Sequence, residues 1–317
     1  IPGARESKRV LTSTELQKIT PRPKRLGIIG GGPIGVEFAG IFSSYGTEVT
    51  LIEGAPALFG RYDDDVAQAA REIIAAQGIT AHAGVRVETV ADNADSLTVN
   101  YLDSEGASKH LEVDYVMVAT GRKPATEGLG LENTSIETTE HGAIAVDEHL
   151  RTTAPNIFAL GDVNGGPQFT YISLDDYRVV LSQLLGDGSR STKDRRAVAA
   201  TIYMNPPLSS VGLTERDALA AGHTIKVAAK PVAAIAAMPR AKTLENPRGI
   251  MKFVIDAETD QILGAQLLVV ESMEVINLVA LAMRHNITAS QLRDEIYTHP
   301  SITEGLNEVL ANAVPVN

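Results

Sequence analysis

The sequence predicts an α/β chain whose first part has a Rossmann-like fold and whose last part combines strands and helices differently. An apolar run at 25–30, typical of a buried parallel strand, continues through a glycine-rich turn into a helical pattern. A second strand pattern, 48–53, ends in an acidic residue. After a charged connector, 186–196, strands and helices follow without another glycine motif. A chain of 317 residues is long enough for two or three domains.

The composition argues against some classes of partner. The formal net charge is −11 and no block of Lys and Arg occurs, which disfavours nucleic acid or an anionic membrane surface. The longest apolar run, Gly264 to Val270, is strand-sized and too short for a membrane span. The first residues, Ile1-Pro2-Gly3, carry no secretion signal, so we expect a cytoplasmic protein. We predict no metal site.

The residues Gly30-Gly-Gly-Pro-Ile-Gly35 form a G-x-G-x-x-G turn between a strand and a helix. In this setting Gly30 permits the tight turn, Gly32 lets the backbone approach a pyrophosphate, and Gly35 lets the helix pack close to the strand. Exposed N–H groups at the helix start then meet the phosphates. We therefore predict that a dinucleotide binds at Gly30, Gly32, Pro33, Ile34 and Gly35. The alternative is a turn that only joins a strand to a helix.

Glu53, at the end of the second strand, lies where Rossmann folds bind the adenosine ribose. Its carboxylate accepts hydrogen bonds from both ribose hydroxyls and repels a 2′-phosphate. We therefore predict NADH as the nucleotide. Arg61 lies nearby in the sequence, which leaves NADPH open.

The other elements follow from periodicity and end signals. Ser13 to Leu16 forms a short capped helix, and the helix at 63–77 opens with three aspartates and closes at Gly78. The helix at 271–285 has apolar residues on two sides and should be largely buried. Further helices are expected at 169–185 and from Thr214 to Gly222, and strands at 85–88, 97–101, 111–113, 115–119, 249–255 and 262–269.

His299 and Glu304 form the candidate catalytic pair. Pro300 keeps His299 extended and outside the helix that starts after it, and Glu304 falls in the first turn of that helix. A carboxylate bonded to one ring nitrogen fixes the tautomer and raises the basicity of the other, which suits acid/base work. The alternative is a capping box from Ser301 to Glu304, and both roles can coexist. We interpret the remaining histidines as loop or surface residues: His82, His110, His141, His149, His223 and His285.

Four motifs in this order resemble the pyridine nucleotide-disulfide oxidoreductases, the flavoenzyme family of glutathione reductase, dihydrolipoamide dehydrogenase and mercuric reductase. They are the glycine turn at 30–35, Thr120-Gly-Arg-Lys-Pro124, Gly161-Asp162, and His299-Pro300 with Glu304. The resemblance covers essentially the whole chain. Thr170-Tyr171 stand where dihydrolipoamide dehydrogenases tend to carry Ala-His. The run around them is similar to a reactive-chlorine-resistance subgroup that reduces hypothiocyanous acid.

The resemblance implies FAD as a second cofactor. Asp162 would accept a hydrogen bond from a ribitol hydroxyl, and Gly161 would allow the backbone to approach closely. The helix that starts at Phe169 and Thr170 would direct its amides at the pyrimidine side of the isoalloxazine. The alternative interpretation makes Asp162 an ordinary turn residue.

Three further residues receive expected places from the resemblance. Gly121 would lie at the exit of the NAD domain. Glu37 is either a first-turn acid favoured by the helix dipole or a neighbour of the nicotinamide. His299 would serve the disulfide of the opposite subunit of a homodimer.

The resemblance also implies a domain order and a missing part. The expected segments are the end of a first FAD-domain segment at 1–20, an NAD(P)-binding domain at 21–145, a remnant of a second Rossmann-like FAD domain at 146–195, and an α+β dimerisation domain at 196–317. Because the sequence has no cysteine, the redox-active pair of the family is absent. We therefore expect a fragment that is inactive alone.

The parent would be an FAD- and NAD(P)H-dependent disulfide oxidoreductase. Hydride would pass from NADH to FAD, and the reduced flavin would pass electrons to a cysteine pair that reduces a small oxidant such as hypothiocyanous acid. Two alternatives stay open: an enzyme like dihydrolipoamide dehydrogenase or mercuric reductase, and a non-catalytic NAD-binding or dimerisation module without cysteines.

Overall fold

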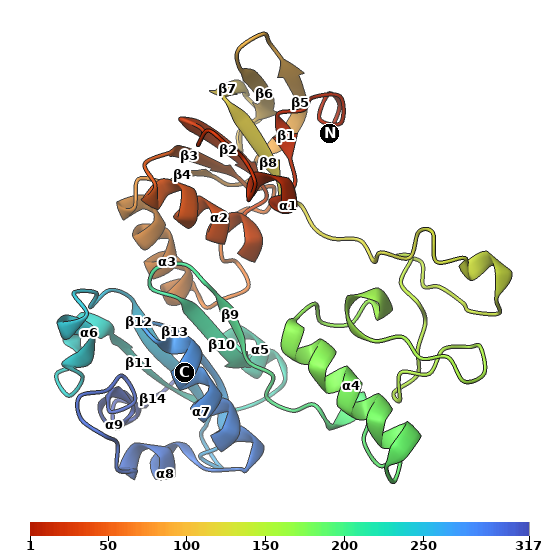
Figure 1. The fold of residues 1–317 in the computed structure, drawn as a ribbon. Coiled ribbons are helices and arrows are strands. Elements are labelled where there is room, and N and C mark those ends of the chain that lie inside the picture. Colours follow the sequence, from red (N-terminus) through yellow and green to blue (C-terminus); the bar gives the residue numbers. More distant parts are fainter. Residues whose placement is uncertain (317) are drawn as a thin grey trace. The chain divides into compact units, whose positions relative to one another are not determined.

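The computed structural model describes residues 1–316 and divides into two compact units. One unit combines the chain up to Thr120 with the chain from Ala197 onward, and the other comprises Gly121–Arg196. Figure 1 traces both along the sequence. The predicted division into segments at 1–20, 21–145, 146–195 and 196–317 stays a prediction.

A parallel sheet forms the first half of the larger unit, with strand order β1-β8-β2-β3-β4. Four of the five residues of β2 and of β3 are buried, as expected for strands covered on both faces. Helices α2 and α3 cover one face (Figure 1). The elements are β1 Val10–Leu11, α1 Ser13–Leu16, β2 Arg25–Ile29, α2 Pro33–Ser44, β3 Glu48–Ile52, α3 Asp64–Ala76, β4 Thr80–His82 and β8 Tyr115–Val118.

An antiparallel sheet covers the other face of the parallel sheet. It consists of β5 Arg86–Asp92, β6 Leu97–Leu102 and β7 Ser108–Val113, in the order β5-β6-β7. Buried and half-buried residues alternate along β6, as a strand with one face on a core requires. Its buried residues pack against Ile29, Ile52 and Val116 of the parallel sheet. The Rossmann-like arrangement predicted from the sequence is therefore confirmed.

The chain from Ala197 forms the second of the two antiparallel sheets, with strand order β14-β11-β12-β13-β10-β9. Helix α7 packs on it through Val275, Ile276 and Val279, whereas Leu281 of the same helix is 46% exposed, so the predicted two-sided burial holds only in part. The elements are β9 Ala200–Ile202, β10 Leu208–Gly212, α5 Glu215–Ala220, β11 Ile225–Pro231, α6 Arg240–Thr243, β12 Ile250–Asp256, β13 Ile262–Leu268, α7 Ser272–Arg284, α8 Ala289–Asp294, α9 Gly305–Leu310 and β14 Val314–Pro315.

A buried polar cluster joins the two halves of the larger unit. Lys252 of β12 is almost fully buried, and its Nζ lies 2.7 Å from Asp65 Oδ1 at the start of α3. Asp63 accepts a 2.6 Å hydrogen bond from Nε2 of Gln266 on β13. Apolar residues of both halves also share one core. These contacts fix the half built on the parallel sheet against the sheet formed by β9 to β14.

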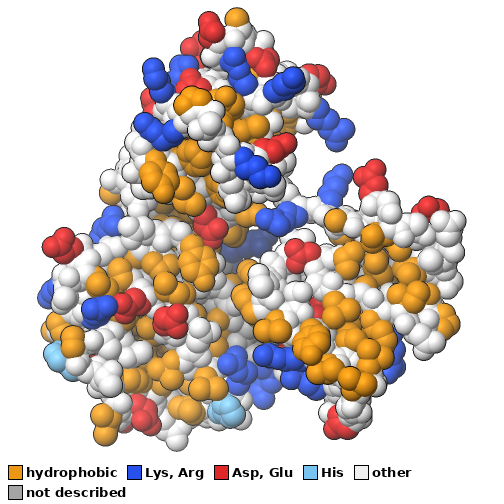
Figure 2. Space-filling view, in the orientation of Figure 1, with side chains coloured by type: hydrophobic (Ala, Val, Ile, Leu, Met, Phe, Trp, Pro, Cys, Tyr) orange, Lys and Arg blue, Asp and Glu red, His pale blue; other side chains and the backbone are white. Residues whose placement is uncertain are grey.

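The smaller unit is mostly irregular. Its elements are η1 Leu131–Asn133, η2 Gly161–Asn164, α4 Thr170–Leu185 and η3 Thr192–Asp194. Its buried apolar cluster consists of Leu150, Val179 and Val180. Helix α4 exposes large apolar side chains, including Leu184 and Leu185, and Figure 2 shows hydrophobic side chains gathered over this unit. A core of this size contributes little hydrophobic stabilisation. Polar contacts therefore fix much of the conformation of this unit.

No helix within residues 1–316 is long and apolar enough to cross a membrane.

Candidate active site

The glycine loop lies where β2 meets α2, at the carboxyl edge of the parallel sheet. Gly30 has a φ of +113°, and a Cβ there would lie 2.4 Å from the carbonyl oxygen of Ala119, so only glycine fits. A Cβ on Gly35 would lie 1.9 Å from the carbonyl oxygen of Gly30. Gly32 is the N-cap of α2, and within residues 1–316 no heavy atom other than those of Gly32 and its two chain neighbours comes within 4 Å of a Cβ built there. The tight turn and the close helix packing predicted for Gly30 and Gly35 are therefore present.

The carboxylate of Glu53 lies against this loop. Its Oε2 accepts a 2.6 Å hydrogen bond from the N–H of Gly31, and its Oε1 accepts one of 2.6 Å from the N–H of Ala55. β2 and β3 are paired in parallel up to Ile29 and Ile52, so the residues that follow them emerge side by side. The structure thus brings the predicted ribose residue and the predicted phosphate loop together, with Pro33 and Ile34 as the first two residues of α2.

One of the two interpretations of Glu37 is wrong. Helix α2 begins at Pro33, which places Glu37 in its second turn, and the first turn contains no acidic residue. Its Oε1 instead accepts a 2.9 Å hydrogen bond from the N–H of Tyr203, just after β9. The carboxylate therefore ties α2 to the antiparallel half of the unit. Proximity to the nicotinamide stays a prediction.

His299 and Glu304 are in direct contact. Nδ1 of His299 lies 2.8 Å from Oε2 of Glu304, and the histidine side chain is 69% exposed while that of Glu304 is 12% exposed. The second carboxylate oxygen accepts a 3.0 Å hydrogen bond from the N–H of Ser301. The hydroxyl of Ser301 in turn accepts one of 3.3 Å from the N–H of Glu304. The reciprocal bonds expected of a capping box and the orientation of His299 therefore coexist.

The predicted start of the last helix is wrong. Helix α9 begins at Gly305, so Glu304 is its N-cap residue and Ser301 lies outside it. The N–H groups of Gly305 and Leu306 donate to the carbonyls of Ile302 and Thr303, three residues back. These bonds form tight turns ahead of the α-helix, and burial of Ile302 anchors them to the core.

Gly161 and Asp162 begin the short turn η2 in the smaller unit. Gly161 is buried with a φ of +73°, whereas Asp162 is exposed. Phe169 is the extended N-cap of α4, and Thr170 is its first residue. The rings of Phe169 and Tyr171 stack with centroids 5.0 Å apart. Gly121, with a φ of +140°, is the first residue of this unit and directly follows Thr120 of the other.

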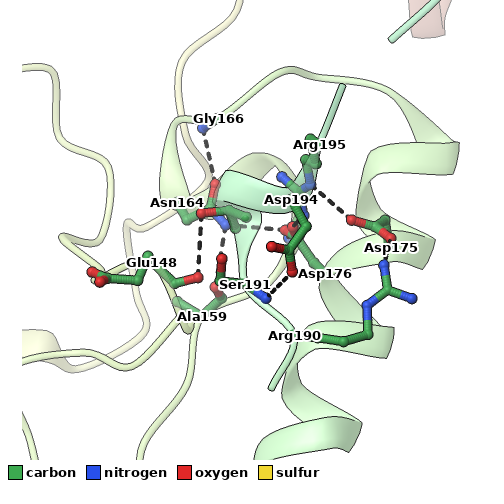
Figure 3. A network of polar contacts seen from close by, with 12 residues as sticks. Glu148, Ala159, Asn164, Gly166, Asp175, Asp176, Arg190, Ser191, Asp194 and Arg195 are labelled. Atoms are coloured by element: carbon green, nitrogen blue, oxygen red, sulfur yellow. Dashed lines mark hydrogen bonds and ion pairs between the residues drawn. The ribbon is translucent and has the colours of Figure 1, made fainter. Parts of the chain in front are cut away.

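Asp176 and its partner Arg195, which the sequence analysis did not select, hold the turn η2 (Figure 3). Asp176 of α4 is 1% exposed, and its Oδ2 accepts hydrogen bonds from the N–H of Gly161 at 2.7 Å and from Nδ2 of Asn164 at 3.1 Å. Its Oδ1 pairs with Arg195. A sequence signal existed, because Asp176 lies four residues from both Ile172 and Val180 and so on the buried face of the helix.

Burial opposes the positive charge of Arg195. Hydrogen bonds with Asp175 and Asp176 outweigh it and hold the pKa of the guanidinium above its ordinary value. The guanidinium therefore stays charged beside the buried Asp176.

His223 lies in a loop, as predicted, and it has a carboxylate partner that the sequence analysis did not select. Its Nδ1 lies 2.9 Å from Oδ2 of Asp256. Hydrogen bonds from the backbone N–H of Thr259, and then from His223, lower the pKa of Asp256. Within residues 1–316 a histidine and a carboxylate are thus in contact twice, and contact alone does not identify a catalytic pair.

Sequence comparison with protein families agrees with this architecture. A family model described as pyridine nucleotide-disulphide oxidoreductase matches residues 1–176, and a model of the dimerisation domain of the same family matches residues 198–310. The chain therefore belongs to the pyridine nucleotide-disulphide oxidoreductase family, the class of FAD- and NAD(P)H-using flavin disulfide oxidoreductases. The predicted fold class and cofactors, FAD with NADH or NADPH, are confirmed at this level.

Individual relatives are consistent with this. The chain is 46% identical, over 98% of its length, to the probable pyridine nucleotide-disulfide oxidoreductase RclA of Escherichia coli, of which it covers 69%. It is 35% identical to a mercuric reductase of Staphylococcus aureus over 96% of its length, covering 55% of that protein. It is 32% identical to a dihydrolipoyl dehydrogenase of Mycobacterium tuberculosis over 97% of its length, covering 66% of it.

Solved structures also match. The HOCl-induced flavoprotein disulfide reductase RclA from Escherichia coli superposes with a TM-score of 0.92 at 45% identity, over 98% of this chain and 70% of that one. LpdA from Mycobacterium tuberculosis superposes with a TM-score of 0.85 at 26% identity, over 96% of this chain and 64% of that one.

Proposed function

We propose that this chain supplies the pyridine-nucleotide site, part of the flavin site and the acid/base histidine of an FAD- and NAD(P)H-dependent disulfide oxidoreductase. The observation that carries the proposal is the 2.8 Å contact between His299 and the buried Glu304, in a chain that also holds a glycine loop braced by a carboxylate. Bound FAD would relay two electrons from NADH to a cysteine pair, which these 317 residues do not contain.

The nucleotide site would be the loop from Gly30 to Gly35 together with Glu53. The open face at Gly32 allows a pyrophosphate to approach the N-terminus of α2, where N–H groups and the helix dipole favour negative charge. Each oxygen of Glu53 already accepts one backbone N–H, and a carboxylate has lone pairs left for the two ribose hydroxyls. The same charge would repel a 2′-phosphate, so NADH is the proposed donor.

The flavin contacts of this chain would come from the smaller unit. The residues there suit the group: Gly161 has the positive φ that a close backbone approach needs, and Asp162 presents an exposed carboxylate as an acceptor for ribityl hydroxyls. The N-terminus of α4, at Phe169 and Thr170, would favour negative charge on the pyrimidine side of the flavin ring.

His299 would move the proton. With Nδ1–H donated to Glu304, Nε2 is left as the basic nitrogen. That nitrogen would take a proton from one thiol of the cysteine pair, leaving a thiolate that attacks the oxidant, and would return the proton to the product. In a homodimer formed through the dimerisation domain at 198–310, the pair would belong to the opposite subunit.

Hypothiocyanous acid is the proposed oxidant. The support is the 46% identity to RclA, whose solved structure is described as an HOCl-induced flavoprotein disulfide reductase. Thr170-Tyr171 also depart from the Ala-His pair of dihydrolipoamide dehydrogenases. Lipoamide and mercuric ion are the alternative substrates. We further propose a cytoplasmic location, and inactivity of the 317-residue chain by itself.

Acceptor competition tests the proposal. NADH oxidation by a flavin-loaded protein that contains this chain together with the cysteine pair is measured with hypothiocyanous acid, lipoamide and mercuric ion in turn. We expect the first acceptor to give a kcat/KM at least about tenfold above the others, a difference of about 1.4 kcal/mol. If NADH binds but no acceptor supports its oxidation, the second candidate function holds. That candidate is a non-catalytic NAD-binding or dimerisation module, and the absence of cysteine from the sequence favours it.

A further inference from the structure

The carboxylate of Asp176 is buried inside the smaller unit, in a place where a charge needs strong partners. Its side chain is 1% exposed on the inner face of α4. An ionised carboxylate is costly to bury unless it is paired and hydrogen-bonded. Asp176 meets this condition with three partners: the N–H of Gly161, Nδ2 of Asn164 and the guanidinium of Arg195.

The geometry of these contacts is specific to one turn. Oδ2 of Asp176 accepts hydrogen bonds from the first and from the last residue of η2, Gly161 at 2.7 Å and Asn164 at 3.1 Å. A single oxygen therefore closes the turn from inside. Asp162 lies between the two anchored residues, and it is exposed.

Asn164 extends the same brace. Its Nδ2 also donates to the carbonyl of Ala159 at 3.2 Å, and its Oδ1 accepts the N–H of Gly166 at 2.9 Å. Figure 3 shows these groups converging behind the turn. The chain on both sides of η2 is thus fixed through one side chain that Asp176 holds.

Arg195 binds the opposite side of the carboxylate. It pairs with Oδ1 of Asp176, and its Nε donates to Oδ2 of Asp175 at 2.8 Å. Arg190 reaches the other oxygen of Asp175, also at 2.8 Å. The connector after α4 is therefore bonded back onto the helix. Asp175 and Asp176 share Arg195, but only the contacts of Asp176 described above lead to the turn.

We propose that Asp176, backed by Arg195, is a positioning residue that holds the Gly161–Asn164 turn in the shape that presents Asp162 to the flavin. Asp176 is buried behind the turn and acts through Asp162. The proposal rests on the proposed function, in which Gly161 and Asp162 form part of the flavin site. The hydrogen bonds from the turn to Asp176 matter because the apolar core of this unit is too small to fix the turn by packing.

Two measurements test the inference. The first is the FAD dissociation constant of the flavin-free form of a protein that contains this chain together with the rest of the proposed flavin site, titrated with FAD and read by flavin fluorescence. The second is hydrogen exchange of the Gly161 amide in the 317-residue chain, which needs no flavin. The variants are Asp176→Asn, Asp162→Ala and, as the matched control, Asp175→Asn, which also removes a carboxylate partner of Arg195.

For Asp176→Asn we expect FAD affinity to fall at least about tenfold and Gly161 exchange to speed up by a similar factor, because a charge-assisted hydrogen bond is lost. Asp175→Asn should change both by less than about threefold. Asp162→Ala should weaken FAD binding and leave Gly161 exchange unchanged.

The outcomes separate the inference from the function beneath it. If Asp162→Ala weakens FAD binding but Asp176→Asn does not, the flavin site stands and the positioning role is wrong. If Asp162→Ala has no effect on FAD, the half-site is wrong and the inference with it. Equal losses in Asp175→Asn and Asp176→Asn would mean a general scaffold and would overturn the inference.

If Asp176→Asn fails to fold, a second variant keeps the proposal testable. Asn164→Ala releases the end of the turn without uncovering a buried charge, and circular dichroism checks its fold. We expect the same direction of change in both measurements. Unchanged FAD affinity in a folded Asn164→Ala would contradict the proposal.

Discussion

Glu304 holds His299 from a buried position. The glutamate side chain is 12% exposed, while the histidine ring that it contacts at 2.8 Å is 69% exposed. Its second oxygen binds the N–H of Ser301 at 3.0 Å, so the carboxylate cannot rotate freely. A histidine held in this way keeps one tautomer while its other nitrogen faces solvent, which is the arrangement a proton carrier needs.

In a flavin-loaded protein that contains this chain together with the cysteine pair, His299→Ala should slow the thiol-dependent half-reaction by about 10²–10⁴, the usual value of general acid–base catalysis. Reduction of the flavin by NADH should be nearly unchanged. Stopped-flow separation of the two half-reactions measures this. Glu304→Gln should cause a smaller loss, because an amide oxygen can still accept a hydrogen bond.

The matched control is His223→Ala, which breaks the other histidine–carboxylate contact of the described chain. It should leave both half-reactions unaltered. An ordinary disulfide is assayed beside hypothiocyanous acid, because a reactive oxidant with a good leaving group needs less acid assistance. Unaltered turnover of that disulfide in His299→Ala would leave the 299–304 segment as a helix start alone.

The 317-residue chain should bind NADH without flavin, and more tightly than NADPH. Glu53→Ala should narrow the difference by about 1–3 kcal/mol, the scale of hydrogen bonds to a charged group. Titration calorimetry measures both nucleotides. Glu48→Ala, at the exposed opposite end of β3, is the control of equal charge and should not change the difference. Equal affinities in the unsubstituted chain would show that Glu53 does not read the ribose.

The same chain should not retain FAD. Gly161 and Asp162 offer contacts to the ribityl and pyrimidine groups, whereas the FAD pyrophosphate needs a glycine fingerprint of its own. The purified chain should therefore be colourless after gel filtration with excess FAD. A stable yellow preparation with one flavin per chain would mean that the half-site is sufficient.

Gly35→Ala should destabilise the chain by about 1–3 kcal/mol and remove NADH binding, because the new Cβ would lie 1.9 Å from a backbone oxygen. Gly40→Ala is the control in the same helix: among the residues described, no heavy atom apart from its chain neighbours and the backbone of its own helix comes within 4 Å of its Cβ position. It should gain up to about 1 kcal/mol from helix propensity. Urea unfolding measures both. A neutral Gly35→Ala would mean that α2 can move away from β2.

Asp114 should make stability depend on pH in the acid range. Burial would raise the pKa of its carboxyl, but hydrogen bonds from the N–H groups and guanidinium of Arg25 and from the N–H of Lys24 outweigh it, and the pKa is lowered below its ordinary 3.8. A carboxyl pKa that is lowered in the folded state stabilises that state at pH values above the ordinary pKa. This stabilisation is lost as the pH falls through the pKa of the folded state. Asp114→Asn should therefore flatten the acid limb of stability against pH. If stability at acid pH depends on pH in the same way in Asp114→Asn as in the unsubstituted chain, this carboxyl does not cause the pH dependence.

Local sequence was enough to predict the parts of the molecule that depend on neighbouring residues. The turn at Gly30 and Gly35, the strand before it, the helix after it and the helix at 64–76 follow from backbone conformation and from periodic burial, which act over a few residues. The contact between His299 and Glu304 was also predictable. The two residues are five positions apart, and Pro300 between them restricts the backbone to few conformations.

Packing decided what lies between distant segments. Whether α9 starts at Ser301 or at Gly305 depends on burial of Ile302 in a core built from other strands. Glu37 binds an N–H that is 166 positions away, and Asp176 finds Arg195 19 positions away. Such bonds form only when the whole chain has folded, because packing of the core brings distant segments together, and a polar group buried there is costly unless it has a hydrogen-bond partner. The sequence alone therefore determined which chemistry the chain carries, and the tertiary structure decided which side chains hold it in place.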